Sequence, residues 1–352
     1  MYERRVKKVR EKLAELGFDA FLVSDEKNIY YLSGFPWGSK LFIPVEGENI
    51  LFVNSVNYEA AKSLAKNVLI ELVGVGEKIE KKISDMVLKG RFKSIGLDKM
   101  DVSEYRRIKN SLEEVKFEVL GDVIWSLRKV KDESELVLIK RAAELTSRGM
   151  ERALEVIKPG IREWEVAAEA EYEMRKLGSS GVAFDTIICS GPETAYPHGG
   201  LGEREIKDGD FVVIDIGAKY HGYCADMTRT VIVGEGTRMQ KHIYEIVVGA
   251  QRIALNHIRA GIKAKEIDEA ARKFIMENGY GEYFIHNLGH GVGLDIHEPP
   301  MLGPLSEDLL LVGNVVTVEP GIYIPGLGGA RIEDTILVEK ERAIKLTGIN
   351  GE

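Results

Sequence analysis

The sequence contains few cysteines and few glutamines. Cys189 and Cys224 are the two cysteines, which are too few for a disulfide framework and lack the paired spacing of a zinc site. Both are expected to pack as small apolar residues. Glutamine occurs only at Gln240 and Gln251, whereas charged residues make up 30% of the chain. This bias is typical of thermophilic proteins.

Long apolar runs and clusters of basic residues are also absent. No stretch approaches the roughly 20 apolar residues that span a bilayer. Residues 1–18 alternate charged and apolar residues and lack the apolar core of a signal peptide. The sequence therefore predicts a cytoplasmic protein without a membrane partner. The formal net charge is -8 and the basic residues lie among acids, which argues against nucleic acid binding.

The length and the pattern of elements predict two α+β domains. Residues 1–125 alternate helix-like and strand-like segments, which indicates a mixed α/β domain. Residues 126–352 open with a long amphipathic helix over residues 132–157. Helices then alternate with two similar hairpins, over residues 211–233 and 315–339. We expect a duplicated unit whose helices cover the outer face of the sheet and whose hairpins enclose a cleft.

Each of these two hairpins carries two acidic residues next to buried apolar strands. Asp215 and Glu319 end the first strands, and Asp226 and Glu333 lie at the start of the second strands. Exposed hairpin ends are the alternative for any single acid, because most acidic residues are exposed. Four converging carboxylates would raise one another's pKa values, whereas two divalent cations would cancel four negative charges. The duplication therefore predicts a dinuclear metal site.

Three of the seven histidines cluster in a glycine-rich segment. His286, His290 and His297 lie within residues 284–299, and His198 lies elsewhere in the second domain. Glycines on both sides of His290 let other groups approach its ring, which favours His290 as a metal ligand. The prolines after His297 exclude a helical zinc motif, and the glycine spacing does not fit a nucleotide-binding loop. A hydrogen-bonded or exposed imidazole is the alternative for each histidine.

These residues together resemble a known ligand set. The order Asp215, Asp226, His290, Glu319 and Glu333 is similar to that of the pita-bread metallopeptidases, the family of methionine aminopeptidase and prolidase. Residues 288–293 and 318–321 resemble the signatures of that family. Residues 28–35 resemble the N-terminal motif of prolidases, aminopeptidases P and creatinases, which methionine aminopeptidases lack. The resemblance implies the proline-specific branch, and the complete ligand set argues against creatinase.

The resemblance implies two divalent metal ions per subunit. Asp215 would bind one ion and His290 with Glu319 the other, while Asp226 and Glu333 would bridge both. Four carboxylates with one imidazole suit Mn²⁺ or Co²⁺, and Zn²⁺ or Fe²⁺ are the alternatives.

The same resemblance implies roles for residues around the metals. Glu319 would transfer a proton to the leaving nitrogen, and His198 and His297 would bind substrate and stabilise the oxyanion, which is typically worth about 3 kcal/mol. His286 and Arg331 would also bind substrate. For Arg331, a bond to a substrate carboxylate, a bond that orients the metal ligands and a purely structural ion pair are all open.

The activity that the resemblance implies is metal-dependent hydrolysis of the peptide bond before proline in Xaa-Pro dipeptides. One alternative is an Xaa-Pro aminopeptidase that accepts longer peptides. Another is a metal-retaining pita-bread protein that binds without catalysis. The family also implies a homodimer, in which Trp37 forms an apolar wall that completes the pocket of the neighbouring subunit.

Overall fold

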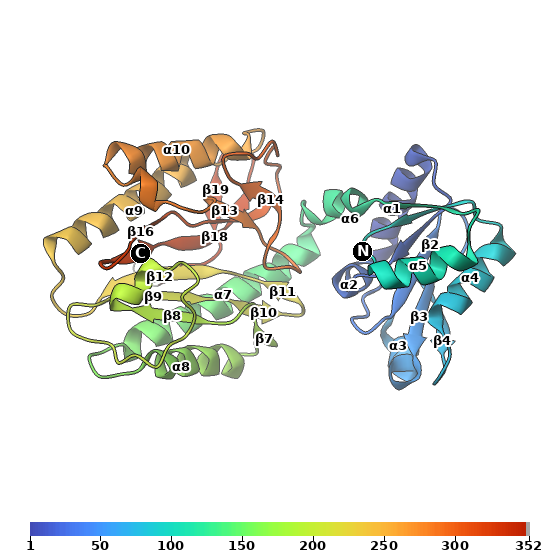
Figure 1. Ribbon diagram of the computed structural model, residues 1–352, viewed down its shortest axis with the longest axis horizontal. Coiled ribbons are helices and arrows are strands. Elements are labelled where there is room, and N and C mark those ends of the chain that lie inside the picture. Colours follow the sequence, from blue (N-terminus) through green and yellow to red (C-terminus); the bar gives the residue numbers. More distant parts are fainter. Residues whose placement is uncertain (350–352) are drawn as a thin grey trace. The chain divides into compact units, whose positions relative to one another are not determined.

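The computed structural model describes residues 1–349, and the chain divides into two compact units. The first comprises Met1–Arg128 and the second begins at Lys129. Helices and strands alternate in both units (Figure 1). Within the described range, none of the helices combines the length and the apolar character that crossing a membrane requires.

The N-terminal unit is a six-stranded sheet with helices on both faces. Its strands are β1 (Ala20–Val23), β2 (Lys40–Pro44), β3 (Ile50–Asn54), β4 (Leu69–Val73), β5 (Ser94–Leu97) and β6 (Lys116–Val119). Its helices are α1 (Tyr2–Leu16), α2 (Glu26–Ser33), η1 (Ser55–Asn57), α3 (Tyr58–Leu64), α4 (Ile79–Gly90), α5 (Val102–Ser111) and α6 (Gly121–Arg128). The strand order is β4-β3-β2-β1-β5-β6, in which β1 is antiparallel to β2 and parallel to β5.

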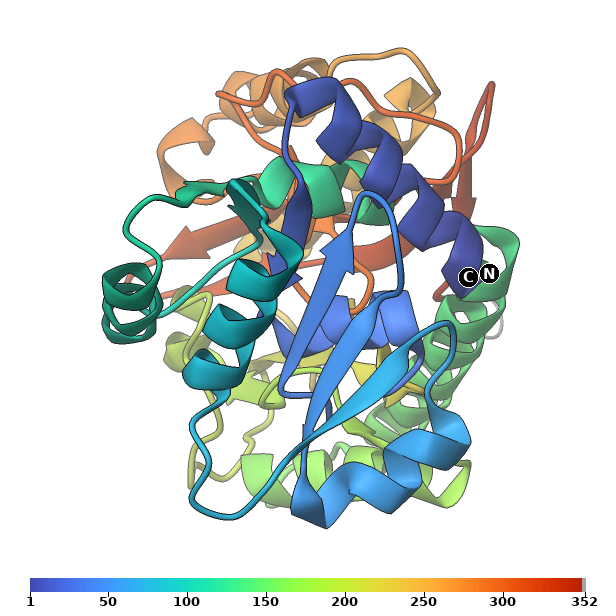
Figure 2. The same cartoon turned by 90° about the vertical axis from the view of Figure 1, so that its right-hand side faces the viewer.

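The central strands β1 and β2 are apolar and buried at successive positions, which explains why both faces of this sheet are covered. Leu22 and Ile95 pack with Ile83 of α4 and Ile108 of α5 in one core cluster. Helix α1 contacts α2, α6, β1 and β2 and covers the opposite face. Figure 2 shows α1 on one side of the sheet and α4 and α5 on the other. The unit therefore has its own apolar core, as expected of a domain.

The C-terminal unit is built around an eight-stranded sheet. Its helices are α7 (Glu133–Val156), α8 (Glu163–Lys176), η2 (Gly191–Ala195), α9 (Arg238–His257), α10 (Ala264–Glu277) and η3 (Gly281–Tyr283). The strands before α9 are β7 (Gly181–Val182), β8 (Ile187–Ser190), β9 (Phe211–Ile216), β10 (Ala218–Tyr220), β11 (Tyr223–Cys224) and β12 (Met227–Ile232). Those after α10 are β13 (Gly289–Gly291), β14 (Glu298–Leu302), β15 (Val315–Val318), β16 (Gly321–Ile324), β17 (Gly328–Arg331), β18 (Glu333–Val338) and β19 (Ala343–Lys345).

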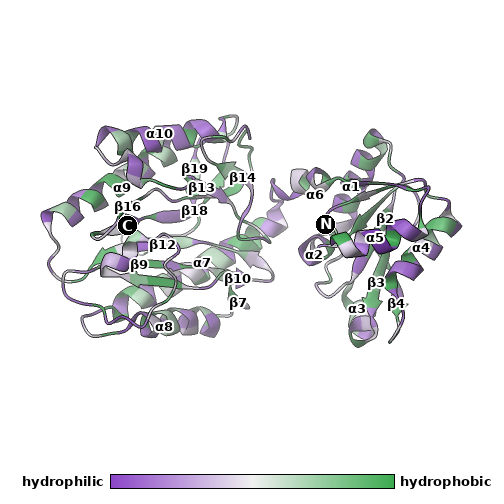
Figure 3. Cartoon of the chain, viewed as in Figure 1, coloured by the Kyte–Doolittle hydropathy of each residue, from purple (hydrophilic) through white to green (hydrophobic). Residues whose placement is uncertain are grey.

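The main sheet has two similar halves that meet at one antiparallel strand pair. Its order is β14-β13-β15-β18-β12-β9-β8, with β19 beside β18. The pair β9–β12 belongs to the first half, the pair β15–β18 to the second, and β12 pairs with β18 between them. The helices that flank this sheet carry both apolar and polar segments (Figure 3). Helices α7 and α8 pack on the first half and α9 and α10 on the second, which fits the expected duplication.

The two hairpins are less regular than the sequence pattern predicts. Between β9 and β12 the chain forms β10 and β11, which join β7 in a separate three-stranded sheet. Between β15 and β18 it forms β16 and β17, which pair only with each other among the described strands. Each predicted hairpin thus leaves the main sheet at its turn and returns to it, and the acidic residues lie where this happens.

Candidate active site

Strand register brings the predicted carboxylates together at one end of the sheet. In the register, Asp215 of β9 lies opposite Thr228 of β12, and Thr228 lies opposite Glu333 of β18. Asp226 directly precedes β12, and Glu319 directly follows β15. Four acids that are far apart in the sequence therefore meet across adjacent strands, because the two halves of the sheet join at β12 and β18.

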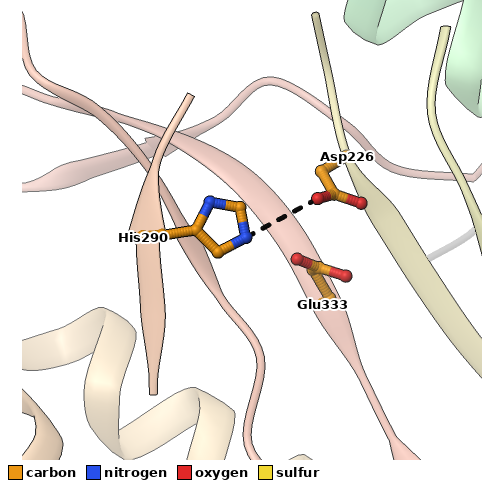
Figure 4. A group of neighbouring side chains, drawn as sticks. All are labelled: Asp226, His290 and Glu333. Carbon is orange, nitrogen blue, oxygen red and sulfur yellow. Dashed lines mark ion pairs between the residues drawn. The ribbon is translucent and has the colours of Figure 1, made fainter. Parts of the chain in front are cut away.

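Asp226, His290 and Glu333 form a compact group that could hold a metal ion. All three are buried, and each offers one ligand atom such that these atoms lie within 4.8 Å of one another (Figure 4). His290 Nε2 lies 3.7 Å from Asp226 Oδ2. His290 Nδ1 lies 3.1 Å from the carbonyl oxygen of Gly291. A hydrogen bond there leaves Nε2 free to bind a metal, which is the usual arrangement of metal-ligating histidines.

The remaining two predicted ligands lie beside this group. Glu319 Oε1 lies 3.3 Å from His290 Nε2 and accepts a 3.1 Å hydrogen bond from Thr317 Oγ1. Asp215 Oδ2 accepts a 2.7 Å hydrogen bond from Arg331 Nη2. All five residues line one cavity of about 380 Å³, which we call the central cavity.

The glycines around His290 serve the backbone rather than its ring. A Cβ on Gly289 would lie 2.1 Å from the carbonyl oxygen of Thr317, and one on Gly291 would lie 2.5 Å from that of Glu298. Both contacts are with backbone atoms of the adjacent strands, which cannot move aside cheaply. We expected these glycines to make room for groups that approach the imidazole. The structure instead shows that both positions need glycine so that β13 can pack against its neighbouring strands.

Three of the carboxyl groups have an oxygen that no donor reaches. Asp215 Oδ1, Asp226 Oδ1 and Glu333 Oε1 are buried without a hydrogen-bond partner in the described part of the chain. Burial raises the pKa of all three groups, and neighbouring carboxylates raise the pKa values of Asp226 and Glu333 further. The charge of Arg331 opposes the rise in the pKa of Asp215. The site therefore has too little positive charge for its carboxylates.

His290 and Glu319 partly compensate each other. Burial acts to raise the pKa of Glu319, but the hydrogen bond and charge of His290 bring that pKa below its usual range. Burial acts to lower the pKa of His290, and the same interaction with Glu319 raises it. The three carboxyl oxygens named above and the imidazole nitrogen of His290 can each donate an electron pair to a cation. They converge at a place where the surrounding negative charge favours cations. These residues fit divalent metal ions.

The three histidines predicted to bind substrate also line the central cavity. They are His198, His286 and His297. The His297 ring lies edge-on to that of His290, with 4.3 Å between the ring centroids. His286 Nε2 lies 2.9 Å from the hydroxyl of Tyr323. Burial lowers the pKa values of His286 and His297, so both favour the neutral form, which can donate or accept a hydrogen bond.

Arg331 is almost fully buried and donates hydrogen bonds to three side chains of the site, of which Thr228 Oγ1 lies 3.2 Å from Nε. Besides Asp215, its guanidinium contacts Tyr323, because Nη1 donates a 2.8 Å hydrogen bond to the Tyr323 hydroxyl. In this arrangement Arg331 orients a predicted metal ligand. Trp37, the other residue expected to contact substrate, belongs to the N-terminal unit, where it is 55% exposed and packs edge-to-face on Phe35.

Sequence reasoning missed several residues that hold the ligands in place. Thr228 Oγ1 donates a 2.6 Å hydrogen bond to Glu333 Oε2, and Thr317 supports Glu319. Both threonines lie two positions from a predicted ligand, and alternation along a strand places such residues on the same face. That spacing was a usable signal. For Tyr323 no comparable signal exists, because its partners Arg331 and His286 lie on other elements.

Comparison with known proteins gives the same assignment over the whole chain. Residues 137–340 match the model of metallopeptidase family M24, and residues 5–130 match the creatinase/prolidase N-terminal domain. An Xaa-Pro dipeptidase of Pyrococcus horikoshii is 41% identical over 345 residues, which are 97% of this chain and 96% of that protein.

Solved structures agree with this result. An Xaa-Pro dipeptidase from Bacillus anthracis has a TM-score of 0.95 at 37% identity, covering 100% of this chain and 99% of that one. An X-Pro aminopeptidase from Thermotoga maritima has a TM-score of 0.88 at 38% identity, covering 97% and 99%. The predicted fold, a creatinase-like N-terminal domain followed by a pita-bread catalytic domain, is confirmed. The chain belongs to metallopeptidase family M24.

Proposed function

We propose that this metallopeptidase is an Xaa-Pro dipeptidase, which hydrolyses the bond between the first residue and proline. The observation that carries the proposal is the convergence of a complete set of carboxylate and imidazole ligands in the central cavity. Relatives that match nearly the full chain bear the name Xaa-Pro dipeptidase, which supports the dipeptide as substrate. The full ligand set also disfavours a protein that only binds.

The metal ligands in this proposal are Asp215, Asp226, His290, Glu319 and Glu333. Two divalent ions would balance the four carboxylates, and the oxygen-rich donor set favours Mn²⁺ or Co²⁺ over Zn²⁺. When bound, such ions lower the pKa of a coordinated water and polarise the substrate carbonyl.

The other residues of the cavity bind and orient the dipeptide. Glu319, which carries one of the carboxylates beside His290, can pass a proton to the leaving nitrogen. His198 and His297 offer ring N–H groups to the carbonyl oxygen as it gains negative charge. His286 and Arg331 both contact the Tyr323 hydroxyl, so the three side chains form one hydrogen-bonded network. A charged group of the substrate that binds one of them therefore affects the others.

The cavity wall suits a proline ring. Phe184, Ile187, Ile296 and Met301 line it, and they are apolar. A proline amide has no N–H to donate, so recognition of proline depends on shape and apolar contact. These four side chains supply such a surface next to the ligands.

One assay tests the proposal. Protein stripped by a chelator is reloaded with Mn²⁺, Co²⁺ or Zn²⁺ and given Leu-Pro, Leu-Pro-Gly and Met-Ala. We expect Leu-Pro hydrolysis that depends on added metal and that falls by about 100-fold or more in Glu333→Gln. Glu245→Gln, an exposed acid on α9, is the matched control. Activity that survives metal removal, or equal activity on Met-Ala, would contradict the proposal.

An Xaa-Pro aminopeptidase is the second candidate. The likeness to the X-Pro aminopeptidase of Thermotoga maritima favours it, since that structure matches this chain almost as fully as the dipeptidases do. The tripeptide separates the two functions. Hydrolysis of Leu-Pro-Gly at least as fast as Leu-Pro would assign the aminopeptidase.

Three further predictions accompany the proposal. The family resemblance implies a homodimer in which Trp37 reaches the partner's active site, and the composition predicts a cytoplasmic location and adaptation to heat. The exposure of Trp37 agrees with a role in contacting another molecule. Size measurement in solution tests the homodimer.

A further inference from the structure

A second hollow adjoins the central cavity. It has a volume of about 630 Å³, and we call it the side hollow. Asp185, Ile187 and His198 line both spaces, so the two share this part of their walls. The side hollow is also lined by Glu171 of α8 and by Thr186, and neither lysine nor arginine contributes to its wall.

Among the described residues that line the central cavity, Asp185 is the one acid outside the predicted metal set. It lies two residues before Ile187, which pairs directly with Asp215 across β8 and β9. Two extended residues span at most about 7 Å, so the Asp185 carboxylate lies just beyond the metal ligands along the sheet. Its side chain is exposed and makes no hydrogen bond or ion pair to the described residues. It is therefore available to a ligand.

A buried hydroxyl in the same wall also lacks a partner. Thr186 is 5% exposed, and its Oγ1 has no hydrogen-bond partner among residues 1–349. A buried hydroxyl without a partner is costly, and such groups usually indicate a ligand or water. Thr186 can accept a hydrogen bond from a cationic N–H group. The orphaned hydroxyl is evidence for a polar ligand that is independent of the acidic charge nearby.

We propose that the side hollow is a subsite for a basic side chain, lysine or arginine, on the residue that precedes proline. This inference rests on the proposed function and specifies its substrate class. Asp185 binds the cationic group, Thr186 accepts a hydrogen bond from it, and Glu171 adds negative charge. The stem of the side chain passes Ile187, since lysine and arginine place their methylene groups along apolar surface.

The position of Asp185 favours the side chain over the α-ammonium group. The α-ammonium is attached to the carbon next to the reacting carbonyl, so it lies among the metal ligands themselves. The end of a lysine or arginine side chain lies several bonds farther away. Asp185 and the side hollow occupy that more distant position, and the hollow has room for a long side chain.

The test compares Arg-Pro and Lys-Pro with Met-Pro, a substrate with a long uncharged side chain. In Asp185→Asn we expect kcat/KM to fall about fivefold for the two basic substrates and to change by less than about twofold for Met-Pro, because a partly exposed ion pair is lost. Asp185→Glu keeps the charge and should keep the preference. Glu173→Gln, on α8 but paired with Lys176, is the matched control.

Salt and charge reversal give two further readouts. Added NaCl should lower kcat/KM for Arg-Pro more than for Met-Pro, because salt screens exposed charge pairs. Asp185→Lys should favour Glu-Pro over Arg-Pro. An equal loss on all substrates in Asp185→Asn would overturn the subsite and assign Asp185 to the α-ammonium, and no change on any substrate would also overturn it. Wild-type protein inactive on every Xaa-Pro peptide would instead refute the proposed function.

Discussion

Thr228 and Glu333 lie opposite each other across the strand pair that joins the two halves of the sheet, and the Thr228 hydroxyl donates a 2.6 Å hydrogen bond to Glu333. The bond satisfies one carboxylate oxygen and leaves Oε1 without a partner among the residues that the structure describes. Thr228 therefore orients the free oxygen toward Asp226 and His290. A threonine thus determines how a proposed metal ligand presents its second oxygen to the site.

The first prediction concerns this threonine. Thr228→Val keeps the shape of the side chain but removes the donor, and we expect metal affinity to fall by about 10-fold to 100-fold, as for other residues that orient metal ligands. Competition with a chelator measures the affinity. Thr230→Val is the matched control, because the Thr230 hydroxyl is buried in the same strand but bonds the backbone of Arg331. Equal losses in both variants would show that only packing was disturbed.

The second prediction concerns stability after metal removal. Burial and mutual repulsion raise the pKa values of Asp226 and Glu333, so the folded metal-free protein holds protons that the unfolded chain has released. The stabilising effect of these protons is present at low pH and is lost as pH rises above the ordinary range of carboxyl groups. Urea midpoints of stripped protein should fall between about pH 5 and about pH 8.

Metal should abolish most of this pH dependence. Bound cations stabilise the ionised carboxylates and take over the role of the protons. The comparison is therefore between stripped and reloaded protein at each pH. If stripped protein gains stability relative to reloaded protein as pH rises, the carboxylates do not repel one another as the structure indicates.

The sequence predicts that these acids meet at one place, because buried charge is rare. An acidic residue at the end of a buried apolar strand is costly unless its charge is compensated. The same pattern at Asp215 and Glu319 therefore indicates one shared cation. The structure adds the register, in which Asp215, Thr228 and Glu333 align across three strands. Pairing between distant strands depends on the whole fold, so local patterns cannot supply it.

Other parts of the site were beyond the reach of sequence patterns. The contact of Tyr323 with Arg331 and His286 joins β16, β17 and the loop before β13, and no spacing along the chain indicates it. The glycines beside His290 were noticed, but their role depends on how closely Thr317 and Glu298 approach them. In the fold, the order of helices and hairpins was predictable, whereas the small sheets at the hairpin turns were not.

The third prediction concerns Trp37 and the proposed homodimer. If this side chain contacts the substrate in a partner subunit, Trp37→Ala should raise KM for Leu-Pro by about fivefold, which corresponds to the loss of about 1 kcal/mol of apolar contact. Trp164→Ala is the control, because Trp164 is also largely exposed but lies on α8. An unchanged KM in Trp37→Ala would remove the proposed role.

The fourth prediction concerns a buried ion pair next to His297. Lys131 Nζ lies 2.9 Å from Glu298 Oε1, and both side chains are 1% exposed. Glu298 is the first residue of β14 and directly follows His297, so the ion pair fixes the end of the strand next to this histidine. Lys131→Met leaves a buried carboxylate without its cation, and we expect the free energy of unfolding to fall by about 3–5 kcal/mol.

A variant in which both partners are replaced distinguishes the effect of the unpaired charge on stability from the effect of lost packing. Replacing both partners with apolar residues of similar volume removes the unpaired charge, and such replacements are often neutral or stabilising. Lys131→Met combined with Glu298→Met should therefore be more stable than Lys131→Met alone in urea unfolding of metal-loaded protein. Its KM for Leu-Pro should still exceed that of the wild type, because His297 loses a fixed neighbour. A double variant less stable than the single would mean that Glu298 stabilises the fold through its other contacts, and that Lys131 is not its main partner.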